Sequence, residues 1–398
     1  MILNFRKHSF CLAVVVTLTS WVTTAAQTEI SPSTERSLWS NIDTDDSIIH
    51  FAGYADSGYL ITKGQSDDVF SAKFAPIIHY QYQDWLLFEA EGEFEFERAD
   101  ATETNAALEY AMLDFIINDN LAVVVGRFLS PVGQFSQNLH PSWINKLPTA
   151  PIGFSGGHDG AGAAPNVDFG LQARGGFETG RSSRLNYAVF VGNGPDLIVE
   201  ETEDGDLIIE GYELLAKIRD SNSNKSTGLR LGFLPVPHFE IGVSYNQADA
   251  AFSRIKPSDG NTEEEDDHSG DQEILTLRDR SYRVWALDYY YAPPQMKNLV
   301  LRGEYVSTRL GSGREDEYDH DAKTWEAWYT QAAYSLANNK VEAVVRYGNF
   351  TLPDDSTTKQ WAIGMNYLFN SRSIVKAAYE FNSGSQANRI IFQYAYGF

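Results

Sequence analysis

Strict alternation of apolar and polar residues constrains this chain more than any other feature. After Trp85, apolar or small residues alternate with five glutamates as far as Glu97. A period of two places successive side chains on opposite faces of a β-strand, so this strand has one apolar face and one acidic face. Both a soluble β-sandwich and a membrane barrel contain such strands. The rest of the chain has to decide between them.

The same alternation recurs about every 10–15 residues and predicts an all-β fold. It continues to the C-terminus, where an alternating segment ends on Phe398, a pattern that resembles outer-membrane assembly signals. An even number of strands is typical of single-chain bacterial barrels. The sixteen predicted strands are 48–61, 69–83, 85–97, 105–117, 120–128, 166–177, 185–193, 226–234, 238–248, 281–292, 298–308, 323–336, 340–350, 359–369, 373–382 and 388–398.

The predicted connections alternate between short turns and long loops, which is the layout of bacterial outer-membrane barrels. We therefore predict a transmembrane antiparallel β-barrel of about sixteen strands. An additional loop element is expected within 205–220. The short connections are at 83–84, 118–120, 235–237, 293–294, 337–339 and 370–371, and the long ones are 129–165, 195–226, 249–280 and 309–323.

The N-terminus predicts export. Basic residues at 6–8 precede an apolar run, Phe10 to Leu18, and small residues follow up to Ala26. This order is typical of a secretory signal peptide, and the apolar run is too short to cross a bilayer as a helix. We expect a signal peptide at 1–26, a short extension at 27–46 and the barrel at 47–398, located in a bacterial outer membrane.

Charge and cysteine content exclude several classes of function. Without residues 1–26, which hold two of the 31 basic residues, 29 Lys and Arg face 54 Asp and Glu, a net charge of −25. Such a chain is a poor partner for nucleic acid. The only cysteine, Cys11, lies in the signal peptide, so the mature chain forms no disulfide. The histidines show no metal-ligand spacing, and we assign neither a metal nor a cofactor.

The polar faces of the strands predict a water-filled interior. A lysine or arginine facing lipid at the midplane costs about 2–4 kcal/mol, and a barrel of about 16 strands is wide enough for an aqueous lumen. The glutamate row is either a wall that attracts cations or a hydrated lining partly paired with arginine. The arginines are also expected to form a basic stripe facing it. The candidate pore-lining residues are Glu89, Glu91, Glu93, Glu95, Arg127, Arg174, Arg302, Glu304, Arg346 and Lys376.

Two consecutive stretches carry a family resemblance. Residues 108–115 read LEYAMLDF and residues 123–133 read VVVGRFLSPVG. They resemble the phosphate-selective porins, in which a strand E-x-Y-L-D-Y precedes V-G-x-F-K-T-P-F-G. Residues 229–245 also look like a hairpin of that family. The resemblance covers most of the mature chain but is specific only in these places. It implies a sixteen-stranded, trimeric porin in which the loop after Pro131 folds into the lumen as a constriction.

The departures from the family pattern bear on selectivity. Leu129 stands in place of the usual lysine and Ser130 in place of the threonine. Carboxylate-lined pores favour cations. We therefore predict passive diffusion of small hydrophilic solutes with at most a mild cation preference; the alternative is a substrate-specific channel for phosphate or another small anion. The candidate residues of the constriction loop, about 129–165, are His140, Lys146, His158 and Asp159.

Two further motifs have ordinary explanations. Residues 153–157 match G-x-S-x-G, but a nucleophile elbow needs a preceding strand and a following helix, which this loop lacks. The acidic run 263–267 could hold divalent cations and bridge lipopolysaccharide, yet it reads more simply as a solvated loop. A barrel enzyme or an adhesin is the remaining alternative. No catalytic cluster supports an enzyme, and the expected partners are outer-membrane lipid, lipopolysaccharide and the permeating solutes.

Overall fold

The computed structural model describes residues 47–398, except 67, 98–104, 155–161, 203–205, 215–222, 257–278, 315–317, 337–338 and 385. The predicted signal peptide and N-terminal extension lie outside these residues, as do His158, Asp159 and the acidic run 263–267. Within the described ranges, no helix combines the length and the apolar character needed to cross a membrane.

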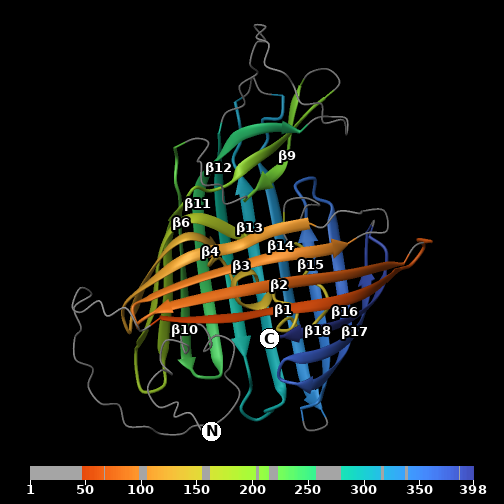
Figure 1. Cartoon of the computed structure of the whole chain (residues 1–398). Helices are drawn as coiled ribbons and strands as arrows, with labels where there is room; N and C mark the ends of the chain where they lie inside the picture. The colour runs from red at the N-terminus through yellow and green to blue at the C-terminus, as the bar shows by residue number, and fades with distance from the viewer. Residues whose placement is uncertain are drawn as a thin grey trace.

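Sixteen strands form the wall of one closed antiparallel β-barrel (Figure 1). Each pairs with its neighbours in chain order, and the last strand pairs with the first from Tyr54↔Gly397 to Thr62↔Arg389, which closes the sheet. The predicted all-β barrel and its even strand count are therefore confirmed. The wall strands are β1 (Ser47–Thr62), β2 (Val69–Tyr82), β3 (Leu86–Glu97), β4 (Asn105–Asn118), β5 (Leu121–Leu129), β6 (Val167–Glu178), β7 (Arg184–Gly192), β10 (Ser226–Val236), β11 (Phe239–Lys256), β12 (Arg280–Tyr291), β13 (Leu299–Leu310), β14 (Lys323–Leu336), β15 (Val341–Thr351), β16 (Thr357–Asn370), β17 (Ser373–Asn382) and β18 (Arg389–Gly397).

The connections divide the barrel into a short-turn end and a long-loop end. Ser47, at the start of β1, pairs with Tyr82 beside the β2–β3 turn, and the N–H of Gly397 donates to the carbonyl of Arg372 in the β16–β17 turn. Both ends of the described chain therefore lie toward the short-turn end. Two of its turns use the left-handed backbone region, at Gln83 (φ 52°) and Asn339 (φ 63°). Asparagine tolerates this region better than most residues.

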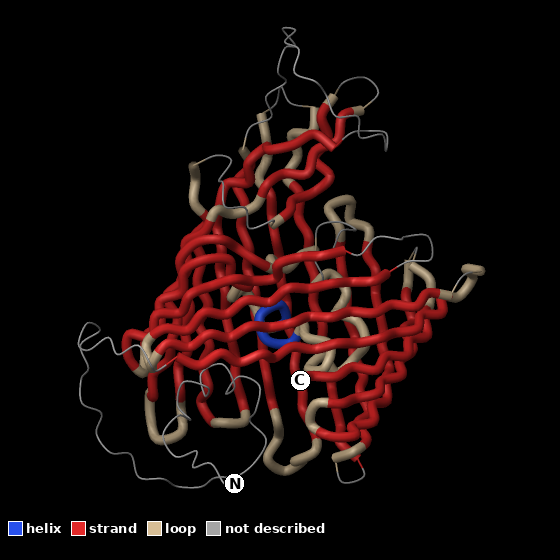
Figure 2. Tube along the Cα trace, in the orientation of Figure 1, coloured by secondary structure: helices blue, strands red, loops and turns tan. Residues whose placement is uncertain are grey.

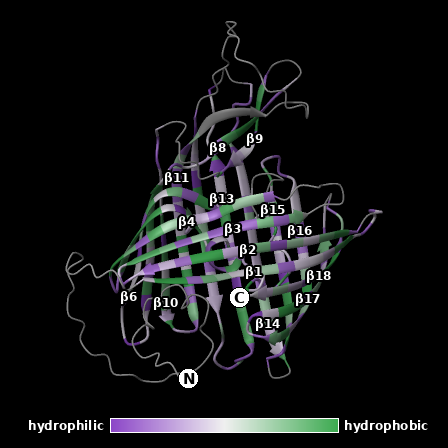
Figure 3. Ribbon diagram, in the orientation of Figure 1, coloured by the Kyte–Doolittle hydropathy of each residue, from purple (hydrophilic) through white to green (hydrophobic). Residues whose placement is uncertain are grey.

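Alternation along each wall strand separates an outer from an inner face. In β12, Tyr282, Val284 and Ala286 are buried, whereas Trp285 and Leu287, which alternate with them, are about half exposed. Hydropathy alternates along most wall strands in the same way (Figure 3). The exposed face carries the apolar residues that the sequence pattern assigned to one side, as expected for a barrel in contact with lipid.

Two further strands, β8 (Asp196–Glu201) and β9 (Leu207–Glu213), form a hairpin within the connection from β7 to β10. The hairpin stands above the barrel at the long-loop end (Figure 1), where β8 pairs in parallel with the end of β11. It begins about ten residues earlier than the element expected within 205–220 and overlaps it.

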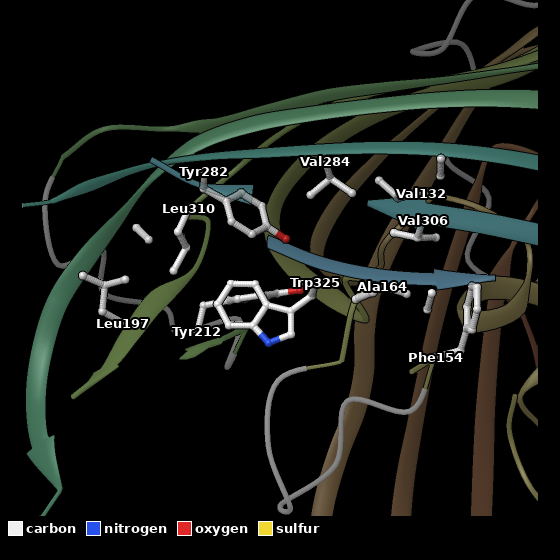
Figure 4. Close-up of a cluster of buried hydrophobic side chains, with 14 of the residues drawn as sticks. Val132, Phe154, Ala164, Leu197, Tyr212, Tyr282, Val284, Val306, Leu310 and Trp325 are labelled. Atoms are coloured by element: carbon white, nitrogen blue, oxygen red, sulfur yellow. The ribbon is translucent and has the colours of Figure 1, made fainter. Parts of the chain in front are cut away.

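An apolar cluster occupies part of the barrel interior below this hairpin (Figure 4). The ring of Tyr212 on β9 lies 5.1 Å from that of Tyr282 and 5.3 Å from that of Trp325. All three side chains are at most 4% exposed. The inner face was predicted to be polar, so this apolar section of the interior was not foreseen.

Candidate functional site

The described residues of the connection between β5 and β6, which are 130–154 and 162–166, fold into the barrel; we call them the inward loop. Figure 2 shows its single π-helical turn, η1 (Phe135–Leu139), inside the barrel at about mid-height. The carboxylate of Glu304 on β13 accepts hydrogen bonds from the backbone N–H groups of Gln134 (3.1 Å) and Phe135 (3.0 Å). The N–H of Gly133 donates to the hydroxyl of Ser244 at 3.2 Å. The start of the loop is thus fixed to β11 and β13.

A second anchor holds the later part of the inward loop. The guanidinium of Arg346 on β15 donates to the backbone carbonyls of Thr149 (2.8 Å) and Ala150 (2.9 Å). The hydroxyl of Thr149 donates to the carboxylate of Glu380, which also pairs with Arg389 at 2.6 Å. Hydrogen bonds to charged groups are stronger than neutral ones, so this network holds the loop firmly against β15 and β17.

A third anchor lies between these two in the sequence of the loop. Lys146 forms an ion pair with Glu342 on β15 at 3.0 Å. The side-chain amide of Asn366 donates to the carbonyl of Lys146 at 2.8 Å. The ammonium of Lys376 donates to the carbonyl of Ser142. The inward loop is therefore bound along the β11–β17 side of the barrel.

These contacts place three of the predicted pore-lining residues against the loop. Glu304, Arg346 and Lys376 lie on the interior face, but they are only 4%, 1% and 0% exposed. Each forms hydrogen bonds with backbone groups of the loop. Arg302, on the same side of the barrel, is half-buried on β13.

A cavity of about 320 Å³ remains between the inward loop and the opposite wall. The wall contributes Asp56 from β1, Lys73 from β2, Glu93 and Glu95 from β3, and Glu109 from β4. The loop contributes a partly apolar surface, made by Phe135, Ser136, His140, Ser142, Asn145, Pro148, Ala150 and Phe154.

Lys73 is the basic side chain among these acids. Its ammonium lies 2.8 Å from Glu93 Oε1 and 2.5 Å from Glu95 Oε1. Asp56 faces Lys73 across the β1–β2 pair. Glu93 and Glu95 were predicted to line the pore, whereas Asp56, Lys73 and Glu109 were not. For Lys73 the signal was present, because it stands between the apolar residues at 72 and 74 in an alternating strand.

The remaining predicted wall residues lie nearer the short-turn end. Arg174 pairs with Asp114 at 2.7 Å and lies 3.9 Å from Glu89. Arg127 donates to the backbone carbonyl of Glu109 at 3.1 Å. Of the four arginines predicted to form a basic stripe facing the glutamate row, these two lie among the acids of β3 and β4, whereas Arg302 and Arg346 lie on β13 and β15. Glu91 is buried, and its Oε1 lies 4.0 Å from Nε2 of His140.

His140 is the titratable residue of the inward loop beside the cavity. Burial, together with the smaller effect of the nearby charge of Lys73, lowers the pKa of His140 to about 4. The imidazole is therefore neutral at neutral pH. Loop residues within reach of the cavity thus contribute neutral groups, whereas the charges come from the wall.

The described residues contain no group of three or more His, Cys, Asp or Glu side chains arranged to hold a metal ion. Of the G-x-S-x-G motif, Gly153 and Phe154 are described, and Gly153 has a φ of +78° in a tight turn. The ring of Phe154 packs 5.1 Å from that of Tyr329 on the wall. This half of the motif serves packing.

Comparison with known proteins supports the fold. No protein-family model matches the chain, and no curated protein is similar to it in sequence. Among solved structures, it resembles the anion-selective porin from Comamonas acidovorans (TM-score 0.55, 11% identity, 88% of this chain and 100% of that one). It also resembles the outer membrane channel DcaP of Acinetobacter baumannii (0.53, 10%, 89% and 99%). A third is OmpT, an outer membrane protein of Vibrio cholerae, in its trimer form (0.52, 13%, 89% and 100%). At these identities the likeness shows a porin-type barrel.

Proposed function

We propose that this protein is an outer-membrane porin through which small hydrophilic solutes and ions diffuse passively. One observation carries the proposal: a closed sixteen-stranded barrel whose inward loop leaves a cavity with a charged wall. Barrels of this size are wide enough for an aqueous path, and an inward loop narrows it. Passive diffusion needs no cofactor, because it requires only an open path and the charges that line it.

The proposed preference is for cations. Four carboxylates, Asp56, Glu93, Glu95 and Glu109, line the cavity together with one ammonium, that of Lys73. A surplus of carboxylates lowers the electrostatic energy of a cation in the passage and raises that of an anion. The preference is mild because Lys73 neutralises part of this charge at close range.

The same proposal covers location and assembly. The exposed apolar face fits contact with lipid, and the predicted signal peptide supports export to the outer membrane, where lipopolysaccharide would contact the long-loop end. A homotrimer is proposed from two sources: the sequence resemblance, and the trimer form named for the Vibrio cholerae protein of similar fold.

Planar-bilayer recording of the refolded mature chain tests the function. We expect stable ionic conductance and, in a salt gradient, a reversal potential of cation sign. The double variant E93Q/E95Q should shift this potential toward anions, because it leaves Lys73 with fewer opposing charges. A matched control is E178Q, which neutralises an exposed glutamate at the end of β6, at the short-turn end of the barrel.

The outcomes separate the parts of the proposal. Absence of any conductance would overturn the porin assignment while leaving the barrel intact. An anion-sign potential in the unmodified protein would favour the anion-specific channel. Equal shifts in the double variant and in E178Q would show that the cavity does not set selectivity.

A further inference from the structure

Two histidines lie side by side on the interior face at the short-turn end of the barrel. His50 on β1 is directly opposite His79 on β2 in the strand register. Their Nδ1 atoms are 3.5 Å apart, and their rings are nearly parallel, with centroids 5.8 Å apart. His50 is exposed and the side chain of His79 is 23% exposed, so both are accessible from solution.

Glu89 on β3 orients one member of the pair. Its Oε1 lies 3.2 Å from Nε2 of His79. A carboxylate only accepts hydrogen bonds, so Nε2 carries the hydrogen and, in the neutral ring, Nδ1 keeps its lone pair. That lone pair is on the side facing His50. A histidine that ligates a metal almost always donates its other ring N–H to a carboxylate, a carbonyl or water, which is the arrangement seen here.

We propose that His50 and His79 bind one divalent transition-metal ion, such as Zn²⁺ or Cu²⁺, through their Nδ1 atoms. Two nitrogens bound tetrahedrally to zinc at about 2.0–2.1 Å are about 3.3–3.4 Å apart, close to the separation in the structure. Rotation about the Cβ–Cγ bonds, whose energy wells are broad, aims both lone pairs at one ion. Imidazole suits zinc and copper, and water completes the coordination.

The β1–β2 register creates this site. The histidines are 29 residues apart in sequence, a spacing that matches no metal-ligand motif, and a cross-strand pair brings their side chains together. The proposal does not depend on conduction. The site lies at the short-turn end, away from the cavity between the inward loop and the acidic wall, and it requires only the folded barrel.

Copper titration followed by electron paramagnetic resonance tests the site. The sample is the refolded mature chain in detergent, without a histidine tag. We expect saturable binding of a single Cu²⁺ with nitrogen hyperfine structure from two imidazoles. H50Q and H79Q should each weaken binding by roughly tenfold or more and remove one nitrogen from the spectrum. The control is H238Q, which alters a histidine in the β10–β11 turn at the same end of the barrel, packed near Tyr291.

A third variant tests the role of Glu89. E89Q keeps both imidazoles but offers His79 a weaker and less selective partner, so affinity should fall by about tenfold while two nitrogens remain in the spectrum. Circular dichroism and resistance to heat on gels show whether each variant is folded. Copper binding that is absent, or that is unchanged in both H50Q and H79Q, would overturn the proposal.

Discussion

Replacing Gly133 by alanine should release the start of the inward loop. Gly133 has a φ of +74°, in the left-handed region. A Cβ at this position would overlap Oε1 of Glu304 and lie 2.5 Å from its Cδ. The carboxylate would have to withdraw, and it would then no longer accept the N–H groups of Gln134 and Phe135.

The expected cost has two parts. An alanine in the left-handed region is strained by about 1–2 kcal/mol. The two hydrogen bonds to a charged acceptor contribute about 1.5–3 kcal/mol each. Gly64 provides the matched control: its φ is +90°, and a Cβ there would meet nothing within 4 Å. G64A should therefore show only the cost of backbone strain. The stabilisation lost locally in G133A should exceed that lost in G64A by at least about 3 kcal/mol.

Hydrogen exchange measured by mass spectrometry is the direct assay. A difference of about 3 kcal/mol corresponds to roughly 100-fold faster exchange of the amides at 134 and 135 in G133A than in the unmodified protein. G64A should leave these amides unchanged. If exchange at 134 and 135 were equally slow in G133A, Glu304 would not be what holds the loop, and the anchoring scheme would fail.

Three further predictions address the loop and the interior. R346Q removes the donors to Thr149 and Ala150. We expect the unfolding free energy to fall by about 3 kcal/mol and the single-channel conductance to become higher and noisier, because the loop is released. Unchanged conductance would show that this part of the loop does not form the constriction. The lowered pKa of His140 means that only the unfolded state takes up a proton between pH 6.5 and about 4, so stability should fall as the pH drops through this window. H140Q should show a smaller fall in denaturant titrations, and identical pH profiles would contradict the burial of a neutral ring. W325A should cost about 3–5 kcal/mol by opening a cavity in the apolar cluster; a cost below 1 kcal/mol would show that the cluster is loosely packed.

The wall of the barrel was predictable because each strand carries its own evidence. Alternation assigns every residue to one of two faces, and contact with lipid makes the outer face predominantly apolar. This local signal placed the strand ends to within about two residues, except at β11, which continues to Lys256 although its predicted end was 248. It also placed Glu93 and Glu95 on the interior face, where they line the cavity.

What lies inside the barrel was not predictable in the same way. Alternation states that Glu304 and Lys376 face inward but not what they meet there. Each contacts backbone groups of the inward loop that are about 170 to 234 residues away in sequence. The apolar cluster around Trp325 likewise depends on the β8–β9 hairpin covering it. The pairing of His50 with His79 depends on the register between β1 and β2, which cannot be read from the sequence.

The β8–β9 hairpin does more than link β7 to β10, because it contacts two other segments of the protein. The hydroxyl of Tyr212 donates to the carbonyl of Gly162 in the inward loop, and the N–H of Ile209 donates to Asp319 between β13 and β14. Surface loops usually accept deletions and inserted tags, since few buried contacts depend on them. The β8–β9 hairpin instead connects the inward loop to the segment between β13 and β14. An epitope or affinity tag is better grafted elsewhere, and shortening this connection would expose Trp325 and Tyr282 to water.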